Sequence, residues 1–135
     1  GMNDEDPENV ELDVLTYDAS GGTEHFISFE DFEKDLLVGF ARLRFPNDPV
    51  RRELENAALL RELHVYGSEV GVGDATADGQ HQHQGYGRRL MARAEEMVAD
   101  AGYDKLSVIS GIGARQYYKQ KLGYHQDGPY VSKRL

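Results

Sequence analysis

The chain of 135 residues contains no cysteine. Disulfide bonds, thiolate metal sites, iron–sulfur clusters and cysteine nucleophiles are therefore excluded. No apolar run approaches the roughly 20 residues that are needed to cross a bilayer, and no charged-then-apolar signal segment opens the chain. We expect a soluble, cytoplasmic protein with no membrane partner.

Basic residues are scarce: 15 Lys and Arg stand against 24 Asp and Glu, the formal net charge is −9, and only five residues are Lys. An acidic surface repels nucleic-acid phosphates, so the composition by itself disfavours RNA binding. An acidic, lysine-poor surface also suits a halophilic protein, because high salt screens the self-repulsion. An ordinary acidic cytoplasmic protein is the alternative.

The apolar content is sufficient for one packed core. Hydrophobic residues make up 39% of the chain, with eight Tyr and five Phe, and this length fits a single domain. Residues 1–9 are acidic and nearly devoid of apolar side chains, which predicts a flexible tail. The domain is then expected to span residues 10–135.

Hydrophobic periodicity predicts the secondary structure. Strands are expected over residues 10–14, 25–29, 34–45, 58–66, 105–109, 123–127 and 130–133. Apolar residues at spacings of three and four predict an amphipathic helix over 88–101 that ends at Gly102, and a shorter helix follows over 114–121. The fold class is therefore α/β or α+β, with a mixed, mainly antiparallel sheet of six to seven strands flanked by helices.

The predicted strand over 58–66 has one apolar face and one chemically equipped face. Alternation assigns Leu59, Leu63 and Val65 to the apolar face. Glu62 and His64 fall on the other face, together with Tyr66. The long polar stretch over 67–84 that follows is expected to be functional or mobile.

A glycine-rich segment, Gln82-His83-Gln84-Gly85-Tyr86-Gly87-Arg88, leads directly into the predicted helix. The first N–H groups of a helix lack internal partners, and the helix dipole favours negative charge there. Gly85 and Gly87 allow close approach of the backbone to an anion, and Arg88 and Arg89 add positive charge. The segment therefore predicts a phosphate site, with a simple tight turn as the alternative.

The Gln-x-x-Gly-x-Gly spacing matches the acyl-CoA pyrophosphate turn of the GNAT superfamily. It matches neither the dinucleotide fingerprint nor the Walker P-loop, because the glycine spacing differs and no Gly-Lys-Ser/Thr follows. Further strings resemble the C-terminal acetyltransferase domain of the Elongator catalytic subunit family, the tRNA wobble-uridine carboxymethylation factors. These are Arg61-Glu62-Leu63-His64-Val65-Tyr66-Gly67, Val108-Ile109-Ser110-Gly111, Tyr117-Tyr118 and Gly128-Pro129-Tyr130.

The resemblance implies a GNAT fold, with acetyl-CoA as co-substrate wedged between two central strands beside the turn. By the same resemblance, the acetyl-CoA contacts are Glu62, Leu63, His64, Val65, Gln84, Gly85, Tyr86, Gly87, Arg88 and Tyr118. It also implies tRNA as a partner, together with a radical S-adenosylmethionine domain whose cluster needs three cysteines. This chain has neither those cysteines nor the length, so alone it is not expected to complete the tRNA modification.

Breaking a thioester requires a polarised carbonyl, a nucleophile and a proton for the thiolate. A backbone N–H over 63–65 can polarise the carbonyl where the strand edge is splayed or bulged. Tyr118 is the candidate acid and Tyr117 its competitor; adjacent helical residues point about 100° apart, so only one is expected to face the coenzyme. Glu62 or His64 is the candidate base, although a strand histidine is more often structural.

Two other groups of residues are assigned no special chemistry. His81 and His83 lie two residues apart without an evident third ligand, so no metal site is expected. Six arginines are expected to pair with surface carboxylates rather than to line an RNA path. They are Arg42, Arg44, Arg51, Arg52, Arg61 and Arg115.

The leading functional hypothesis is an acetyl-CoA-dependent N-acetyltransferase-type domain that cleaves the thioester during tRNA wobble-uridine modification. The alternatives are a stand-alone acetyltransferase for a protein amine or small molecule, and a non-catalytic acyl-CoA-binding module. The acetyl acceptor and the oligomeric state are not readable from the sequence.

Overall fold

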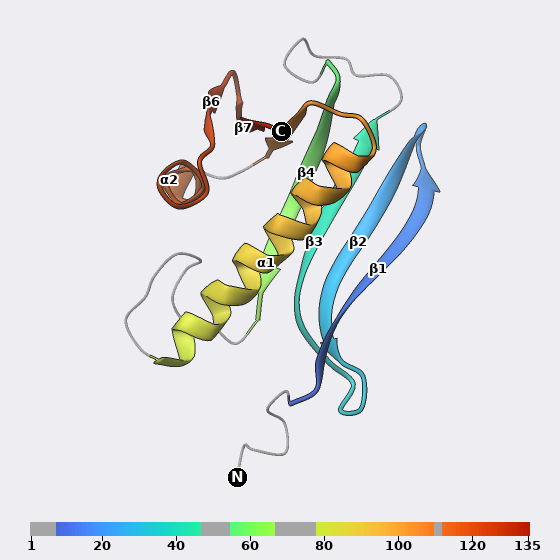
Figure 1. Ribbon diagram of the computed structural model, residues 1–135, viewed down its shortest axis with the longest axis vertical. Helices are drawn as coiled ribbons and strands as arrows, with labels where there is room; N and C mark the ends of the chain where they lie inside the picture. Colours follow the sequence, from blue (N-terminus) through green and yellow to red (C-terminus); the bar gives the residue numbers. More distant parts are fainter. Residues whose placement is uncertain (1–7, 47–54, 67–77, 110–111) are drawn as a thin grey trace.

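The computed structural model describes residues 8–46, 55–66, 78–109 and 112–135. For residues 78–84 and 112–113 it describes the backbone but not the side chains. These residues form seven strands and two helices, arranged as in Figure 1. In chain order the elements are β1 (Val10–Ala19), β2 (Gly22–Asp31), β3 (Leu36–Pro46), β4 (Ala57–Val65), α1 (Asp78–Asp100), β5 (Lys105–Val108), α2 (Ile112–Lys121), β6 (His125–Asp127) and β7 (Tyr130–Arg134).

The strands form one sheet in the order β1-β2-β3-β4-β5-β7-β6. β4 and β5 run parallel, and the other neighbouring strands run antiparallel. A parallel pair needs a crossover connection, and α1 provides it. The predicted fold class, a mixed and mainly antiparallel sheet with flanking helices, is confirmed.

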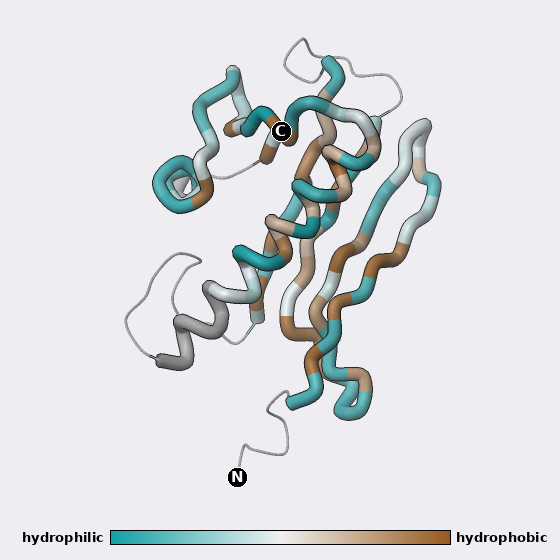
Figure 2. Tube along the Cα trace, in the orientation of Figure 1, coloured by the Kyte–Doolittle hydropathy of each residue, from teal (hydrophilic) through white to brown (hydrophobic). Residues whose placement is uncertain are grey.

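The core lies between the sheet and α1, which crosses in front of β3 and β4 in Figure 1 and contacts β2 to β5. From α1 the buried side chains are Leu90, Met91, Ala94 and Val98. Figure 2 shows hydrophobic residues along the strands behind the helix. Neither helix in the described part of the chain is long and apolar enough to cross a membrane.

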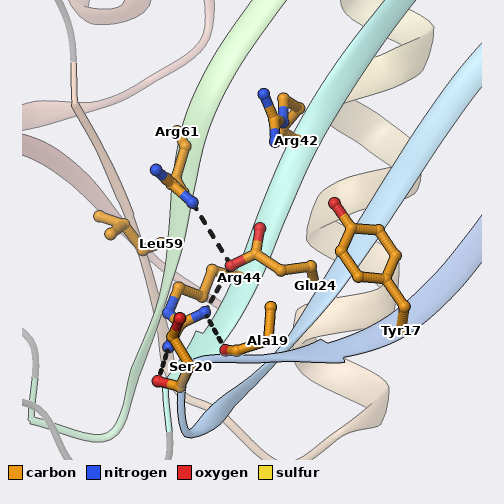
Figure 3. A pocket seen from close by; sticks show the side chains of 8 residues that line it. All are labelled: Tyr17, Ala19, Ser20, Glu24, Arg42, Arg44, Leu59 and Arg61. Atoms are coloured by element: carbon orange, nitrogen blue, oxygen red, sulfur yellow. Dashed lines mark hydrogen bonds and ion pairs between the residues drawn. The ribbon is translucent and has the colours of Figure 1, made fainter.

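The side of β1–β4 opposite α1, here called the open face, carries polar and aromatic side chains. Figure 3 shows Tyr17, Glu24, Arg42 and Arg44 on this side, with α1 behind the strands. Neither helix of the described chain covers this face, because α1 packs on the other side and α2 contacts β6 and β7. The sheet therefore separates a covered side from an accessible one.

Two β-bulges change which residues face the core. The β2–β3 register shifts at Phe29/Glu30, so that Val38 is the extra residue, and Val38 is buried while Leu37 is 37% exposed. Leu37 and Val38 therefore depart from regular alternation, because a bulge inverts the alternation of side chains beyond it.

The second bulge lies in β4. The β3–β4 register shifts between Arg42 and Leu43, which leaves Arg61 as the extra residue on β4. Leu60 is fully buried, whereas Leu59 is only half-buried and lines a pocket on the open face. The prediction that Leu59 shares the apolar face with Leu63 and Val65 was wrong for the same reason.

The start of α1 also differs from the prediction. The helix runs from Asp78 to Asp100, so the segment 82–88 that was expected to be a turn before the helix lies inside it. A glycine in a helix interior costs about 1 kcal/mol relative to alanine, which two glycines followed by a well-packed amphipathic segment can tolerate. The C-terminal end is as predicted, since Gly102 has a positive φ of 93° directly after the helix.

The β2–β3 turn anchors the residues that precede β1. The buried Asp31 carboxylate accepts hydrogen bonds from the backbone N–H groups of Glu8 (2.8 Å), Asn9 (3.2 Å) and Lys34 (3.1 Å). The hydrogen bond from Glu8 is the main cause that holds the pKa of Asp31 below its ordinary value of 3.8, against the opposing effect of burial. Glu8 and Asn9, which precede β1, are therefore already hydrogen-bonded to the sheet.

Replacing Asp31 should alter how stability depends on pH. A lowered native pKa stabilises the fold above the unfolded-state pKa, and this contribution is lost as pH falls through the native pKa. We expect Asp31→Asn to be less stable at neutral pH and to lose less stability between about pH 4 and pH 2. Urea unfolding at several pH values measures this, with Asp13→Asn on exposed β1 as control; parallel curves for Asp31→Asn and the parent would contradict it.

Candidate active site

β4 and β5 pair over a short distance and then part. Their parallel register runs from Ala57↔Lys105 to Leu60↔Val108, and the last hydrogen bond is from the Ile109 N–H to the Leu60 carbonyl (3.0 Å). β4 nevertheless stays paired with β3 as far as Val65. Beyond Leu60, the edge of β4 that faces away from β3 therefore has no strand partner among the described residues.

The backbone of this edge offers hydrogen-bond donors. The Tyr66 N–H donates to the Val38 carbonyl (2.8 Å), toward β3. Because N–H directions alternate along a strand, the N–H groups of Leu63 and Val65 point the other way, toward the unpaired edge. Such amides can bind an extended ligand as an added strand would, or polarise a carbonyl oxygen.

The bulge at Arg61 stands where the two strands part. The sequence predicted an irregular edge over 63–65, and the structure places the bulge two residues earlier. β3 and β4 are tightly apposed just beyond it, since a Cβ built on Gly39 would lie 2.9 Å from the His64 carbonyl oxygen. This close approach fixes the position of the 63–65 segment against β3.

The side chains of Glu62 and His64 share the open face, as predicted from their alternation. Glu62 is exposed and forms an ion pair with Arg42, at 3.8 Å between Oε1 and Nη1. The exposed His64 ring lies 4.4 Å from that of Tyr66 and 6.0 Å from that of Phe40, between centroids. Both candidate bases are therefore accessible from the side opposite α1.

Leu63 and Val65 point to the other side of β4 and pack with the core beneath α1. The glycine-containing part of α1 lies on this same side. Tyr86 packs against Phe29 of β2, with ring centroids 5.2 Å apart. Gly85 is half-buried and Gly87 is buried. Of the other predicted contacts in this segment, Gln84 has its side chain outside the described residues, as do Gln82, His81 and His83.

Arg88 joins the two helices. Its Nη1 donates a weak hydrogen bond to the Lys121 carbonyl at the end of α2, at 3.5 Å. Arg88 also interacts electrostatically with the Tyr117 hydroxyl. Burial raises the pKa of Tyr117, and the positive charge of Arg88 partly offsets that rise. Tyr86, the tyrosine pair, and Leu63 and Val65 of β4 all belong to or pack against one hydrophobic core cluster, so these parts of the chain lie in one region of the fold.

Both tyrosines of the pair are buried in the core cluster. Their ring centroids lie 5.5 Å apart. Leu90, Tyr124 and the neighbouring apolar side chains form a single cluster that encloses both rings, so burial does not distinguish the two, and the expectation that only one faces the coenzyme stays a prediction. The Tyr117 hydroxyl is buried and has no hydrogen-bond partner among the described residues.

Burial raises the pKa of Tyr118 well above its ordinary value, and Tyr117 adds to the rise. The shift is larger for Tyr118 than for Tyr117. Both phenols are therefore protonated at neutral pH and able to donate a hydrogen bond or a proton.

A supporting network behind Tyr118 was not anticipated from the sequence. The Tyr124 hydroxyl donates to Glu95 Oε2 (2.8 Å) on α1, and Lys133 Nζ lies 3.3 Å from Glu95 Oε1. The Tyr124 ring contacts that of Tyr118, with centroids 5.8 Å apart. These residues lie up to 38 positions apart, so no local pattern could have revealed them.

Gly85 gives a test of how α1 begins. A Cβ built there would meet nothing within 4 Å, and alanine favours a helix over glycine by about 1 kcal/mol. We expect Gly85→Ala to raise the free energy of unfolding by about 0.5–1 kcal/mol. Chemical denaturation measures this, with Gly102→Ala, at a positive φ, as the destabilising control; a loss of stability in Gly85→Ala would mean that residue 85 is not helical in solution.

A mixed sheet whose central parallel strands part beside a glycine-containing helix agrees with the GNAT fold that the sequence resemblance implied. The acetyltransferase (GNAT) family model matches residues 3–124. The chain therefore belongs to the GNAT acetyltransferase family.

Two curated relatives and one solved structure define the similarity further. The chain is 46% identical over 132 residues to the tRNA uridine(34) acetyltransferase of Methanocaldococcus infernus, covering 96% of this chain and 24% of the relative. It is 50% identical over 132 residues to Elongator complex protein 3 of Dictyostelium discoideum, covering 96% and 23%. The archaeal Elp3 of M. infernus with an N-terminal deletion matches with a TM-score of 0.82 and 41% identity, over 99% of this chain and 33% of that chain.

These similarities confirm the predicted resemblance to the Elongator catalytic subunit. The chain spans about a quarter of the length of the curated relatives. Within the described residues, no group of three or more His, Cys, Asp or Glu side chains could hold a metal ion.

Proposed function

We propose that this chain binds acetyl-CoA where β4 and β5 part, and that it cleaves the thioester by acetyl transfer. The observation that carries this proposal is the unpaired edge of β4, because the N–H groups of Leu63 and Val65 face away from β3 there. The pantetheine arm of acetyl-CoA, lying along this edge, would accept hydrogen bonds from the backbone through its amide carbonyls. One of these amides would then polarise the acetyl carbonyl.

The pyrophosphate is assigned to the backbone of Gln84–Arg88, with support from Arg88. In the helical conformation these N–H groups are occupied by α1 itself, which begins at Asp78. An anion can use them only if the helix starts near Gly85. Acetyl-CoA binding is therefore expected to unwind the first turns of α1.

Gly85→Ala should therefore weaken acetyl-CoA binding while it stabilises the free protein. The alanine favours the long helix over the bound form, and its Cβ adds bulk beside the phosphate. Isothermal calorimetry with acetyl-CoA, at low and at high salt, measures this; we expect an affinity loss of about 5-fold or more, the counterpart of about 1 kcal/mol. Tighter binding by Gly85→Ala would contradict this pyrophosphate assignment, and no binding by the parent chain at either salt would remove the proposed function.

In the proposed reaction a nucleophile of the acceptor attacks the carbonyl carbon and the carbon–sulfur bond breaks. Glu62 or His64 takes the proton of the nucleophile, directly or through water, and a phenol donates a proton to the departing thiolate. Tyr118 is the first candidate donor. Tyr117 is the competitor, and the Arg88 charge favours it because that charge eases the loss of its proton.

Matched phenylalanine variants distinguish the two tyrosines. We expect Tyr118→Phe to lower thiol release from acetyl-CoA by about 100-fold or more, in the range of general acid catalysis, while calorimetric affinity stays within about 3-fold. Tyr117→Phe is the internal control. Loss of turnover in Tyr117→Phe alone would exchange the two roles, and binding without thiol release by the parent chain would favour a non-catalytic acyl-CoA-binding module.

The acceptor is proposed to be a tRNA uridine, as the name of the M. infernus relative states for that protein. Since the chain spans only about a quarter of that relative, a radical S-adenosylmethionine domain would have to be supplied by another part of the protein or by a partner. A cytoplasmic location follows from the same proposal. The halophilic character stays a prediction from the composition.

A further inference from the structure

The chain directly after α2 turns back and binds to Tyr118. The Tyr118 carbonyl accepts hydrogen bonds from the N–H groups of Leu122 (3.2 Å) and Tyr124 (3.1 Å). Gly123, between them, has a positive φ of 81°, a conformation that lets the backbone reverse direction at the end of a helix. The backbone of Tyr124 is therefore fixed relative to that of Tyr118.

The side chains of these two tyrosines are also in contact. The ring of Tyr124 meets that of Tyr118 edge-on, with centroids 5.8 Å apart and planes at 67°. Both rings are buried in the core cluster. Because a close-packed interior leaves little free volume, a shift of the Tyr124 ring has to be followed by a shift of the Tyr118 ring.

Glu95 of α1 holds the far end of Tyr124. The Tyr124 hydroxyl donates a hydrogen bond to Glu95 Oε2 (2.8 Å). Lys133 Nζ, from β7, lies 3.3 Å from Oε1 and 3.4 Å from Oε2 of the same carboxylate. The same ammonium group lies 5.7 Å from the centroid of the Tyr124 ring. Glu95 therefore connects α1 to the segment that follows α2 and to β7.

The hydrogen bond from Tyr124 to Glu95 is maintained at neutral pH. Burial raises the pKa of Tyr124 above its ordinary value of 10.0, and the negative charge of Glu95 raises it further. The phenol thus stays protonated and donates. A buried hydroxyl without a partner is costly, so Tyr124 also keeps its orientation toward Glu95. Lys133 balances the charge that the carboxylate brings to a partly buried position.

Tyr118 depends on these neighbours for its orientation. Its ring contacts those of Tyr117 and Tyr124, whereas its hydroxyl makes no hydrogen bond with any described residue. Packing of the ring therefore decides where the hydroxyl points. A general acid needs a defined direction, since misplacement by about 1 Å can cost about 100-fold in rate.

We propose that Glu95 and Tyr124 are positioning residues for Tyr118. The carboxylate holds the Tyr124 hydroxyl, and Tyr124 holds the Tyr118 ring at the angle from which its hydroxyl donates a proton to the departing thiolate. The inference rests on the proposed function, because it takes Tyr118 as the acid. The proposed reaction itself uses neither Glu95 nor Tyr124, so their effect on turnover has to pass through Tyr118.

Three substitutions separate the hydrogen bond from the packing. Tyr124→Phe removes only the hydroxyl and keeps the ring, and Glu95→Ala removes the acceptor. We expect each to lower kcat for thiol release from acetyl-CoA about 10-fold, while the calorimetric affinity for acetyl-CoA stays within about 3-fold. Glu95→Gln should restore most of the lost rate relative to Glu95→Ala, because its amide oxygen also accepts a hydrogen bond.

Glu96 provides the matched control on the same helix. It is exposed and pairs with Arg93 one turn away, so Glu96→Ala should change kcat less than about 2-fold. Thermal melting of each variant verifies that it is folded. A loss of coenzyme affinity in Glu95→Ala and Tyr124→Phe that equals their loss of turnover would overturn the positioning role, since it would mean a general disturbance of the coenzyme site.

A double-mutant cycle shows whether Glu95 acts through Tyr118. In the Tyr118→Phe background the acid is already absent, so we expect Glu95→Ala to change the remaining thiol release less than about 2-fold. A residue that only stabilises the fold, or that acts through Tyr117, would cause the same 10-fold loss in both backgrounds. That result would overturn the inference.

Fluorine NMR of the chain labelled with 3-fluorotyrosine gives a readout that does not need turnover. Tyr118→Phe identifies the Tyr118 resonance, which we expect to shift or broaden in Glu95→Ala and in Tyr124→Phe. The resonance of Tyr17, exposed on β1, should stay unchanged in both. An unchanged Tyr118 resonance in both variants would overturn the inference. If the parent chain releases no thiol, the proposed function fails, and this resonance alone decides whether Glu95 and Tyr124 position Tyr118.

Discussion

The geometry of this domain depends on how far two parallel strands stay together. β4 and β5 share four residue pairs and then separate, while β4 continues against β3 for the length of another short strand. Backbone groups left unpaired at such an edge must find another partner, because an unsatisfied N–H group is costly once water is excluded. A bound ligand can be that partner. The pairing of β4 with β3 as far as Val65 and the close approach of Gly39 to His64 place this edge without any ligand being present.

The two faces of the sheet beside the separation of β4 and β5 carry different groups. On the side of α1, Leu63 and Val65 pack into the core and the 85–88 segment lies above the sheet. On the open face, Glu62 lies 3.8 Å from Arg42, and His64 contacts the rings of Phe40 and Tyr66. The two candidate bases thus lie on the side of the sheet opposite the segment to which the pyrophosphate is assigned, and the unpaired edge of β4, where the thioester is proposed to lie, is between them.

Much of this architecture was predictable from the sequence, and what was not predictable has a common cause. Period-2 and helical spacing located the strands and helices, and the glycine fingerprint pointed to the correct family. The two bulges were missed, since an extra residue inverts side-chain alternation without any local signal, and the bulge in β4 misplaced Leu59. The pocket beside Leu59 was missed as a unit, because Glu24, Arg44 and Arg61 come from three strands that only the sheet register brings together. Burial of both tyrosines likewise depends on Tyr124 and α1, which are distant in sequence.

The length of α1 shows how a local preference and a binding site can compete within one segment. Residues 78–84 extend the helix by about two turns, at the cost of placing Gly85 and Gly87 in a helix interior, about 1 kcal/mol each. Alanine at both positions would make the long helix more stable, and would also make the amides of 85–88 harder to free. In the proposed site, a glycine pair lowers the energy that the pyrophosphate must supply to shorten the helix, and the phosphate then gains the helix dipole and the released N–H groups. By this proposal the two glycines bring a shorter form of α1 closer in energy to the observed long helix, as a site that both binds and releases a coenzyme requires.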